Sequence, residues 1–136
     1  MTALTVTAAD VRPLIGSVVK EGVAGGAVNV GNWVYPDSSG TWQAADSDDA
    51  ATAEGRALVV ATASGETSAV SGDGIEVCLF GPVSGFSGLT PGALGYTSPT
   101  AGAVEDAAGT VVWVAGWCYA ATVFFVQPGM ALPTSS

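Results

Sequence analysis

The sequence predicts an all-β protein: a small, single antiparallel domain with at most one short helix and extended termini. Short runs rich in Val, Thr, Trp, Tyr and Phe are bounded by Gly, Pro, Asp and Ser, which is typical of many short strands. No segment of ten or more residues shows clean helical periodicity. A chain of 136 residues is long enough for one domain with one hydrophobic core.

We expect eight strands, each in a run of β-favouring residues between turn residues. Their ranges are 15–20, 27–35, 41–44, 56–63, 75–80, 93–97, 111–119 and 122–127. The clearest hairpin is NWVYPDSSGTWQAAD, where Trp33 and Tyr35 share one strand face and Trp42 begins the return strand after the turn PDSSG. Such aromatic residues usually pack in a core or a subunit interface, and a sugar-stacking platform is the alternative.

The segment SDDAATAEG, residues 47–55, is the one helix candidate, with an ordered loop as the alternative. Ser47 suits the N-cap, acidic residues fill the first turn, and Gly55 suits the end. The acidic run resembles the start of a calcium-binding loop and comprises Asp46, Asp48, Asp49 and Glu54. Ala50 and Ala51 stand where an EF-hand needs a ligand and a turn glycine, so we expect a solvated turn and no metal site. Weak Ca²⁺ binding is the alternative.

Two later segments bear on how the sheet is covered. The strand at 75–80 has one apolar face and one of mixed polarity, which predicts partial cover of the second face by another sheet or another subunit. Residues 107–126 are uncharged. We expect two successive buried strands there rather than a membrane span, because β-branched and aromatic residues dominate, Gly116 interrupts the run and no basic flank is present.

The two cysteines, Cys78 and Cys118, are expected to be buried free thiols. The first ten residues lack the basic start and the long apolar stretch of a signal peptide, which favours a reducing compartment. A disulfide is the alternative if the two strands are neighbours.

Residues 80–102 are uncharged and rich in glycine and proline, which indicates architecture rather than chemistry. Pro91 and Gly92 suit the central positions of a type II turn, because proline presets a negative φ and glycine accepts a positive one. Gly85 and Gly88 bracket Phe86 and allow the chain to pack tightly around one buried ring. We expect a stiff connector that is suited to lie against another protein surface.

Composition excludes several classes of partner. Twelve acidic residues against three basic ones give a formal net charge of -9, so the chain lacks the basic surface that nucleic acids or anionic membranes require. Hydrophobic residues make up 49% of the chain and charged residues only 11%. We therefore expect copies of the chain or a protein partner to cover part of its apolar surface.

The residue types argue against an enzyme and against a bound cofactor. The chain contains no histidine, which excludes Ser-His-Asp and Cys-His nucleophile arrangements and imidazole metal sites. GFSGL lacks the glycine that a nucleophile elbow needs two places after Ser87. Lys20 is followed by Glu21, so no phosphate-binding loop of the Walker type is present, and the glycine spacing does not match a dinucleotide fingerprint. No pair of carboxylates stands in an aromatic-lined context of the kind that glycoside hydrolysis uses.

The termini differ in composition from the rest of the chain. Residues 1–10 are rich in Thr and Ala, and the chain ends in QPGMALPTSS. We expect an N-terminal arm at 1–10, a β domain at 11–128 and a C-terminal tail at 129–136, with both ends mobile in the free protein.

The combination VNVGNWVYPDSSGTWQAAD, GRALVVATA, GPVSGFSGLTPGALGYTSPTAG and VVWVAGWCYAATVFFVQP resembles the small cement, or head decoration, proteins of tailed bacteriophages. The resemblance covers about residues 10 to 128, and GFSGLTPGALGY is its most specific part. Related modules occur in phage fibre and tail proteins.

The resemblance implies a β-barrel or β-tulip-like domain, often a homotrimer, that binds the major capsid protein on the outer surface of the virion after synthesis in the host cytoplasm. The family that the chain resembles has no catalytic residues to carry over to this sequence. The expected function is to staple neighbouring capsomers against the internal pressure of DNA. Expected core or interface residues are Thr2, Leu4, Val6, Trp33, Tyr35, Trp42, Phe86, Leu89, Pro91 and Tyr96. The first ten residues and the connector at 81–92 are the ones expected to touch the capsid.

Two other functions remain open on the sequence. One is a phage tail or fibre module, such as a receptor-binding knob. The other is a carbohydrate-binding domain that uses the tryptophans of the hairpin. An enzyme without histidine would need carboxylate chemistry alone.

Overall fold

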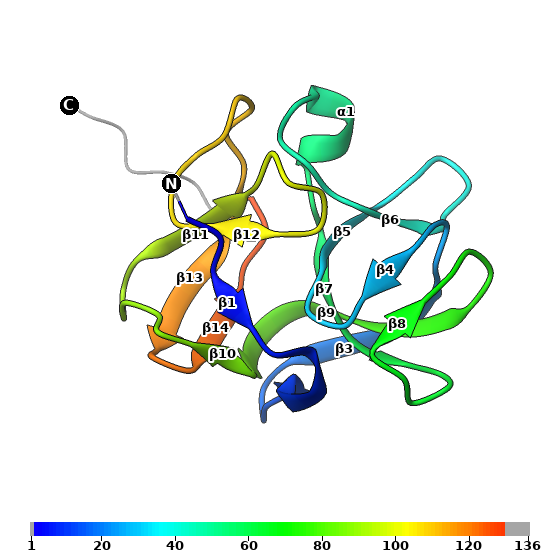
Figure 1. Cartoon of the computed structure of the whole chain (residues 1–136), viewed down its shortest axis with the longest axis horizontal. Coiled ribbons are helices and arrows are strands. Elements are labelled where there is room, and N and C mark those ends of the chain that lie inside the picture. Colours follow the sequence, from blue (N-terminus) through cyan, green and yellow to red (C-terminus); the bar gives the residue numbers. More distant parts are fainter. Residues whose placement is uncertain (1, 130–136) are drawn as a thin grey trace.

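The computed structural model describes residues 2–129 and confirms the all-β prediction (Figure 1). The strands are β1 (Thr5–Val6), β2 (Arg12–Pro13), β3 (Val18–Val23), β4 (Val28–Asn29), β5 (Trp33–Pro36), β6 (Trp42–Ala44), β7 (Ala57–Thr62), β8 (Ser68–Ala69), β9 (Gly74–Ser84), β10 (Phe86–Ser87), β11 (Leu94–Thr97), β12 (Val104–Glu105), β13 (Val114–Ala120) and β14 (Val123–Val126). A 3-10 turn, Ala8–Asp10, and one short helix, α1 (Ala50–Ala53), complete the described elements. Ten of these strands form a curled antiparallel sheet, while β1-β10 and β4-β8 are separate two-stranded pairs.

Strand β9 organises the fold, because it has neighbours along both of its edges. Its first half pairs with β7 and β3, and its second half pairs with β14 and β2. Between the halves, Gly81 has a φ of 117°, and a Cβ there would lie 2.5 Å from the Cα of Ser17. This glycine lets β9 continue to Ser84, beyond the end expected at residue 80. The two halves carry two lobes, which lie side by side in Figure 1.

The first lobe is a ring of strands in the order β3-β9-β7-β5-β6. A parallel bridge between Ala24 and Trp42 closes the ring, and the Gly25 N–H donates to the Trp42 carbonyl at 2.8 Å. The short pair β4-β8 belongs to the same lobe. The predicted hairpin is confirmed as β5-β6, with Tyr35 opposite Gln43.

The second lobe is a half-barrel in the order β12-β11-β13-β14-β9. Residues 2–7, here called the strap, lie across it. Within the strap, Leu4 N–H donates to the Val104 carbonyl at 2.7 Å, while Thr7 N–H donates to the Gly85 carbonyl at 2.9 Å. We expected an arm at residues 1–10, but residues 2–10 are packed on the domain, because the strap supplies hydrogen bonds to β12 on one side and to β10 on the other. The expected C-terminal tail lies outside the described residues, apart from Gly129.

The helix begins later than the sequence predicted. Asp49, rather than Ser47, caps α1, and its carboxylate accepts from the Ala51 N–H at 2.9 Å. Ser47 is buried, and its backbone bonds to Ser98 and Val111 from the second lobe. These tertiary bonds place Ser47 before the helix and leave the capping position to Asp49.

The long uncharged segment contains two successive strands, β13 and β14, as predicted. Among the described residues, no helix has the length and apolar character needed to cross a membrane. Cys78 and Cys118 are free and buried, and burial raises the pKa of both thiols.

The β5-β6 turn depends on the ionised carboxylate of Asp37. Thr41 and Gln43 donate side-chain hydrogen bonds to it at 2.7 and 3.0 Å, and these bonds, the one from Gln43 first, lower the pKa of Asp37 from 3.8 to about 2. The folded state therefore binds this proton less tightly than the unfolded state. The resulting stabilisation is present above pH 3.8 and is lost as the pH falls through about 2.

We predict that Asp37→Asn makes the stability of the protein depend less on pH between pH 4 and pH 2. The asparagine does not titrate, so the urea midpoint of the variant should fall less between pH 4 and pH 2 than that of the wild type. Asp48→Asn, in the exposed acidic turn, is the control and should keep the wild-type slope. Parallel pH profiles for wild type and Asp37→Asn would contradict the role given to this carboxylate.

Candidate interaction surface

The structure brings together the two segments that the sequence predicted would touch a partner. The strap pairs with β10 through β1, with Thr5 opposite Ser87 and Val6 opposite Phe86. Of the expected residues in these segments, Thr2 and Pro91 are exposed, Leu4 and Val6 are half-buried, and Phe86 and Leu89 are buried. The exposed surface of residues 2–5 and 87–89 is here called the strap face.

The strap face is nearly free of charge and is slightly hollowed. A cavity of about 160 Å³ is lined by residues 2–5, residues 87–89 and Asp106. Asp106 is the one acidic residue of this lining, and its carboxylate accepts from the Thr2 N–H at 2.8 Å. The remaining exposed side chains are Thr, Ala and Ser. Because both edges of the strap are already hydrogen-bonded, this face can bind a partner through side chains rather than by strand addition.

The aromatic residues of the hairpin do not belong to the strap face. Trp33 has no exposed surface, and its Nε1–H donates to Thr97 Oγ1 at 3.0 Å inside the core. Tyr35, Trp42 and Tyr96 are half-buried. Trp33 is therefore a core residue of the monomer and is closed to both a partner protein and a sugar.

A second surface, which the sequence analysis missed, lies on the outer face of β9, β14 and β13. Four aromatic rings follow one another across these strands. The centroid distances are 5.1 Å from Phe80 to Phe125, 5.3 Å from Phe125 to Trp117 and 5.8 Å from Trp117 to Tyr119. Because Trp117 and Phe125 stack on each other at an interplanar angle of 29°, they cover each other's ring faces. A flat sugar platform needs those faces exposed, so this packing is better suited to a protein contact.

Aliphatic side chains extend this aromatic row toward the turn between β2 and β3. The whole surface is here called the aromatic face and consists of Leu14, Ile15, Val18, Phe80, Pro82, Trp117, Tyr119, Val123 and Phe125. An open groove of about 520 Å³ belongs to this face, and none of the residues that line it is charged. Exposed large hydrophobic residues in one patch mark an interaction site more strongly than scattered ones do.

The sequence carried a weak signal for the aromatic face. In β14 the successive residues Phe124 and Phe125 point to opposite faces of the sheet, and both are aromatic. Phe124 packs in the core with its ring centroid 5.5 Å from that of Phe86, while Phe125 lies on the outer face. Both faces of the strand were expected to be buried, and the outer one is covered by no element of the described chain.

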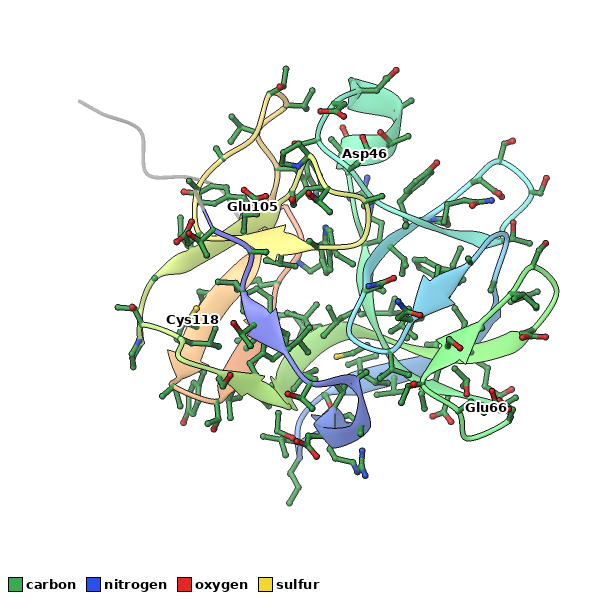
Figure 2. All side chains as sticks on the ribbon, in the orientation of Figure 1. Asp46, Glu66, Glu105 and Cys118 are labelled. Atoms are coloured by element: carbon green, nitrogen blue, oxygen red, sulfur yellow. The ribbon has the colours of Figure 1, made fainter. Side chains whose placement is uncertain are left out.

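Charge divides between the two lobes (Figure 2, where Asp46 and Glu66 lie on the first lobe). Nine of the twelve acidic residues belong to the strands and turns of the first lobe or to the connection between its strands β6 and β7: Glu21, Asp37, Asp46, Asp48, Asp49, Glu54, Glu66, Asp73 and Glu76. From residue 77 to the last described residue, the chain has only two acidic residues, Glu105 and Asp106, and no Lys or Arg. The first lobe is therefore acidic. The second lobe has few charges, namely Glu105, Asp106 and, beside its β2 edge, Asp10 and Arg12.

The ionisable side chains of residues 2–129 make mostly local contacts. Within residues 2–129, no three Cys, Asp or Glu side chains come close enough together to hold a metal ion. In the acidic turn at residues 46–49, the Asp46 carboxylate accepts from the Asp48 N–H and from Thr52 Oγ1. Glu105 is buried, and one of its oxygens accepts from Ser98 Oγ. Arg56 pairs with Glu54 at 3.2 Å.

The strap face, whose one charged residue is Asp106, and the uncharged aromatic face together form the candidate interaction site. Compared with family models, curated proteins and solved structures, the chain matches none.

Proposed function

We propose that this protein is a structural decoration protein of a tailed-bacteriophage head, which binds the outer surface of the capsid and staples neighbouring capsomers. The observation that carries the proposal is the division of charge. An acidic lobe lies beside a lobe with few charges, and the strap face and the aromatic face lie on the side with few charges. This arrangement suits a protein that binds with one side and keeps the other in water. The sequence resemblance described above points to the same class.

The strap face is the surface that we assign to the capsid. It is nearly uncharged, is held in place by hydrogen bonds along both strap edges, and combines both segments expected to touch the shell. A surface held in its binding conformation loses little conformational entropy on docking. The acidic lobe then faces solvent, where its negative charge keeps decorated particles apart.

The stapling itself is mechanical. Each subunit contact with the shell is modest, because an ordinary specific interface buries only about 800 Å² per partner. When an assembly touches several capsid subunits at once, its first contact holds the others at a high effective concentration. A set of individually weak contacts then dissociates slowly as a whole. No step requires a reactive side chain.

Immunogold labelling of intact virions tests the location of the protein. The proposal predicts label over the heads. Label confined to the tail tips would assign the protein to the tail or fibre class, and an absence of label from the particles would exclude both.

We further predict that Ser87→Arg weakens capsid binding at least tenfold. Ser87 is exposed in the two-residue strand β10 on the strap face, and arginine adds bulk and a charge that must be desolvated on docking. The matched control is Ser68→Arg, because Ser68 is exposed in the two-residue strand β8 of the acidic lobe. Co-sedimentation with expanded capsids measures the occupancy. Equal occupancy for the two variants would show that the strap face is not the docking surface.

A further inference from the structure

We infer that a second copy of this chain covers the aromatic face, with Ile15 of each copy seated in the groove of the other. This two-fold pairing goes beyond the proposed function and uses a different surface. Phe124 and Phe86 lie in the core between the strap and the outer sheet face, so one molecule can use both surfaces at the same time.

Ile15 is presented as a rigid apolar knob. It is wholly exposed, with a relative exposure of 102%, at the tip of the turn between β2 and β3. The turn is fixed at its base, because Ser17 donates both its N–H, at 3.1 Å, and its Oγ–H, at 2.6 Å, to the Leu14 carbonyl. Leu14 N–H in turn donates to the Pro82 carbonyl at 2.9 Å, and Gly16 supplies the positive φ of 97°. A side chain held in this way has little backbone entropy to lose on insertion.

The receiving groove lies directly beside this knob. Its lining includes Pro82, Tyr119, Val123 and Phe125, and Ile15 itself lines its edge with the β2-β3 turn, together with Leu14 and Gly16. A knob and a groove next to each other on one face are what an isologous interface requires, because a two-fold axis between them places each knob in the opposite groove. A head-to-tail ring, by contrast, needs the knob and the groove on different faces of the subunit. The geometry therefore favours a two-fold pair over the trimer that the family resemblance implies.

Charge does not oppose a second copy of the chain as the occupant of the aromatic face. With a formal net charge of -9, two copies repel each other wherever their acidic surfaces approach. The aromatic face carries none of that charge, and most of the acidic residues lie between Glu21 and Glu76 in the other lobe. Pairing through this face buries apolar surface without burying a carboxylate.

The exposed area is also on the scale that a dimer needs. Side chains of this type and exposure present roughly 600 Å² of surface per copy. Two copies together would bury about 1,200 Å², which is the lower end of the range for specific interfaces. A reversible dimer with a dissociation constant in the micromolar range is the expected result. Such a pair would carry two strap faces and would double the contacts available for stapling.

Sedimentation velocity of the full chain from about 1 to 500 μM tests the pairing, since a micromolar dimer dissociates across this range. We expect a monomer–dimer equilibrium for the wild type and at least a tenfold weaker dimer for Ile15→Glu, which puts a carboxylate in the groove. Val70→Glu, at an exposed valine of the acidic lobe, should dimerise like the wild type. A wild-type monomer throughout, a trimer, or an Ile15→Glu dimer of unchanged strength would overturn the inference.

Cross-linking tests the register of the pair. A mixture of Ile15→Cys and Val123→Cys chains, distinguished by a mass tag, should form a mixed disulfide, because the knob of one copy reaches the groove of the other. The native Cys78 and Cys118 are buried and should not compete. A mixture of Val70→Cys and Val123→Cys is the control, and cross-linking at the same rate in both mixtures would overturn the reciprocal geometry. Neither experiment involves capsids, so a failure here leaves the proposed head location standing, and the reverse also holds.

Discussion

Replacing Trp33 with alanine is expected to lower the free energy of unfolding by about 3–5 kcal/mol, the range measured for large aromatic truncations in cores. Trp33 has no exposed surface. Its Nε1–H donates to Thr97 Oγ1, which itself donates to the Ala53 carbonyl at 2.8 Å, so the ring joins β5 to β11 and to α1. The alanine variant leaves a cavity and removes the hydrogen bond that Thr97 accepts.

Urea denaturation followed by far-UV circular dichroism measures this loss without relying on tryptophan fluorescence. Trp33→Phe separates the two contributions, because it keeps most of the ring volume and removes the indole donor, with an expected loss of about 1–3 kcal/mol. Val70→Ala, at an exposed valine away from both candidate surfaces, should change the stability by about 0.5 kcal/mol or less. If Trp33→Ala unfolded at the wild-type midpoint, the ring would not be part of the core.

Gly116→Ala is expected to destabilise the protein by more than about 4 kcal/mol, which is exceptional for the addition of one methyl group. Gly116 lies in β13 opposite Val126 of β14, with a φ of 157°. A Cβ at Gly116 would collide with the backbone carbonyl oxygen of Phe125 on the neighbouring strand. Because the obstacle is backbone, no side-chain rotation relieves the collision, and the β13-β14 pairing has to open.

The matched control is Gly72→Ala. Gly72 has a φ of 95°, but a Cβ there meets no atom within 4 Å, so only the left-handed backbone strain of about 1–2 kcal/mol applies. Thermal unfolding compares the two variants. If Gly116→Ala does not fold, its soluble yield and circular dichroism spectrum still separate it from a folded Gly72→Ala. Equal melting temperatures for the two would contradict the collision.

The features that sequence predicted well are those that neighbouring residues determine. The β5-β6 hairpin follows from a turn segment between two aromatic-rich runs, and its register has Tyr35 opposite Gln43. The type II turn is equally local: Ala93 N–H donates to the Thr90 carbonyl at 3.0 Å, and Gly92 has the expected positive φ of 87°. The tight packing around Phe86 is confirmed as well, because that ring is buried.

The features that sequence missed depend on partners far along the chain. Strands β1, β8, β10 and β12 have two residues each, too few to show any alternation. Thr5 pairs with Ser87 only because folding brings the two segments together, and a Thr/Ala-rich N-terminus has the composition of a free arm. Ser47 shows the same limit, since its local pattern suits a helix cap while its tertiary bonds to Ser98 and Val111 exclude it.

The sequence by itself determined four properties of this protein: its all-β character, its turns, its acidic charge and its lack of histidine chemistry. These are properties of composition and of short-range geometry, which a chain possesses before it folds. Only the tertiary structure decided which apolar side chains are covered. Trp33 and Phe125 are alike in sequence as aromatic residues of short strands, yet one is enclosed by both lobes and the other lies on an open face. Burial depends on what the rest of the chain places over a residue, and that is settled by long-range packing.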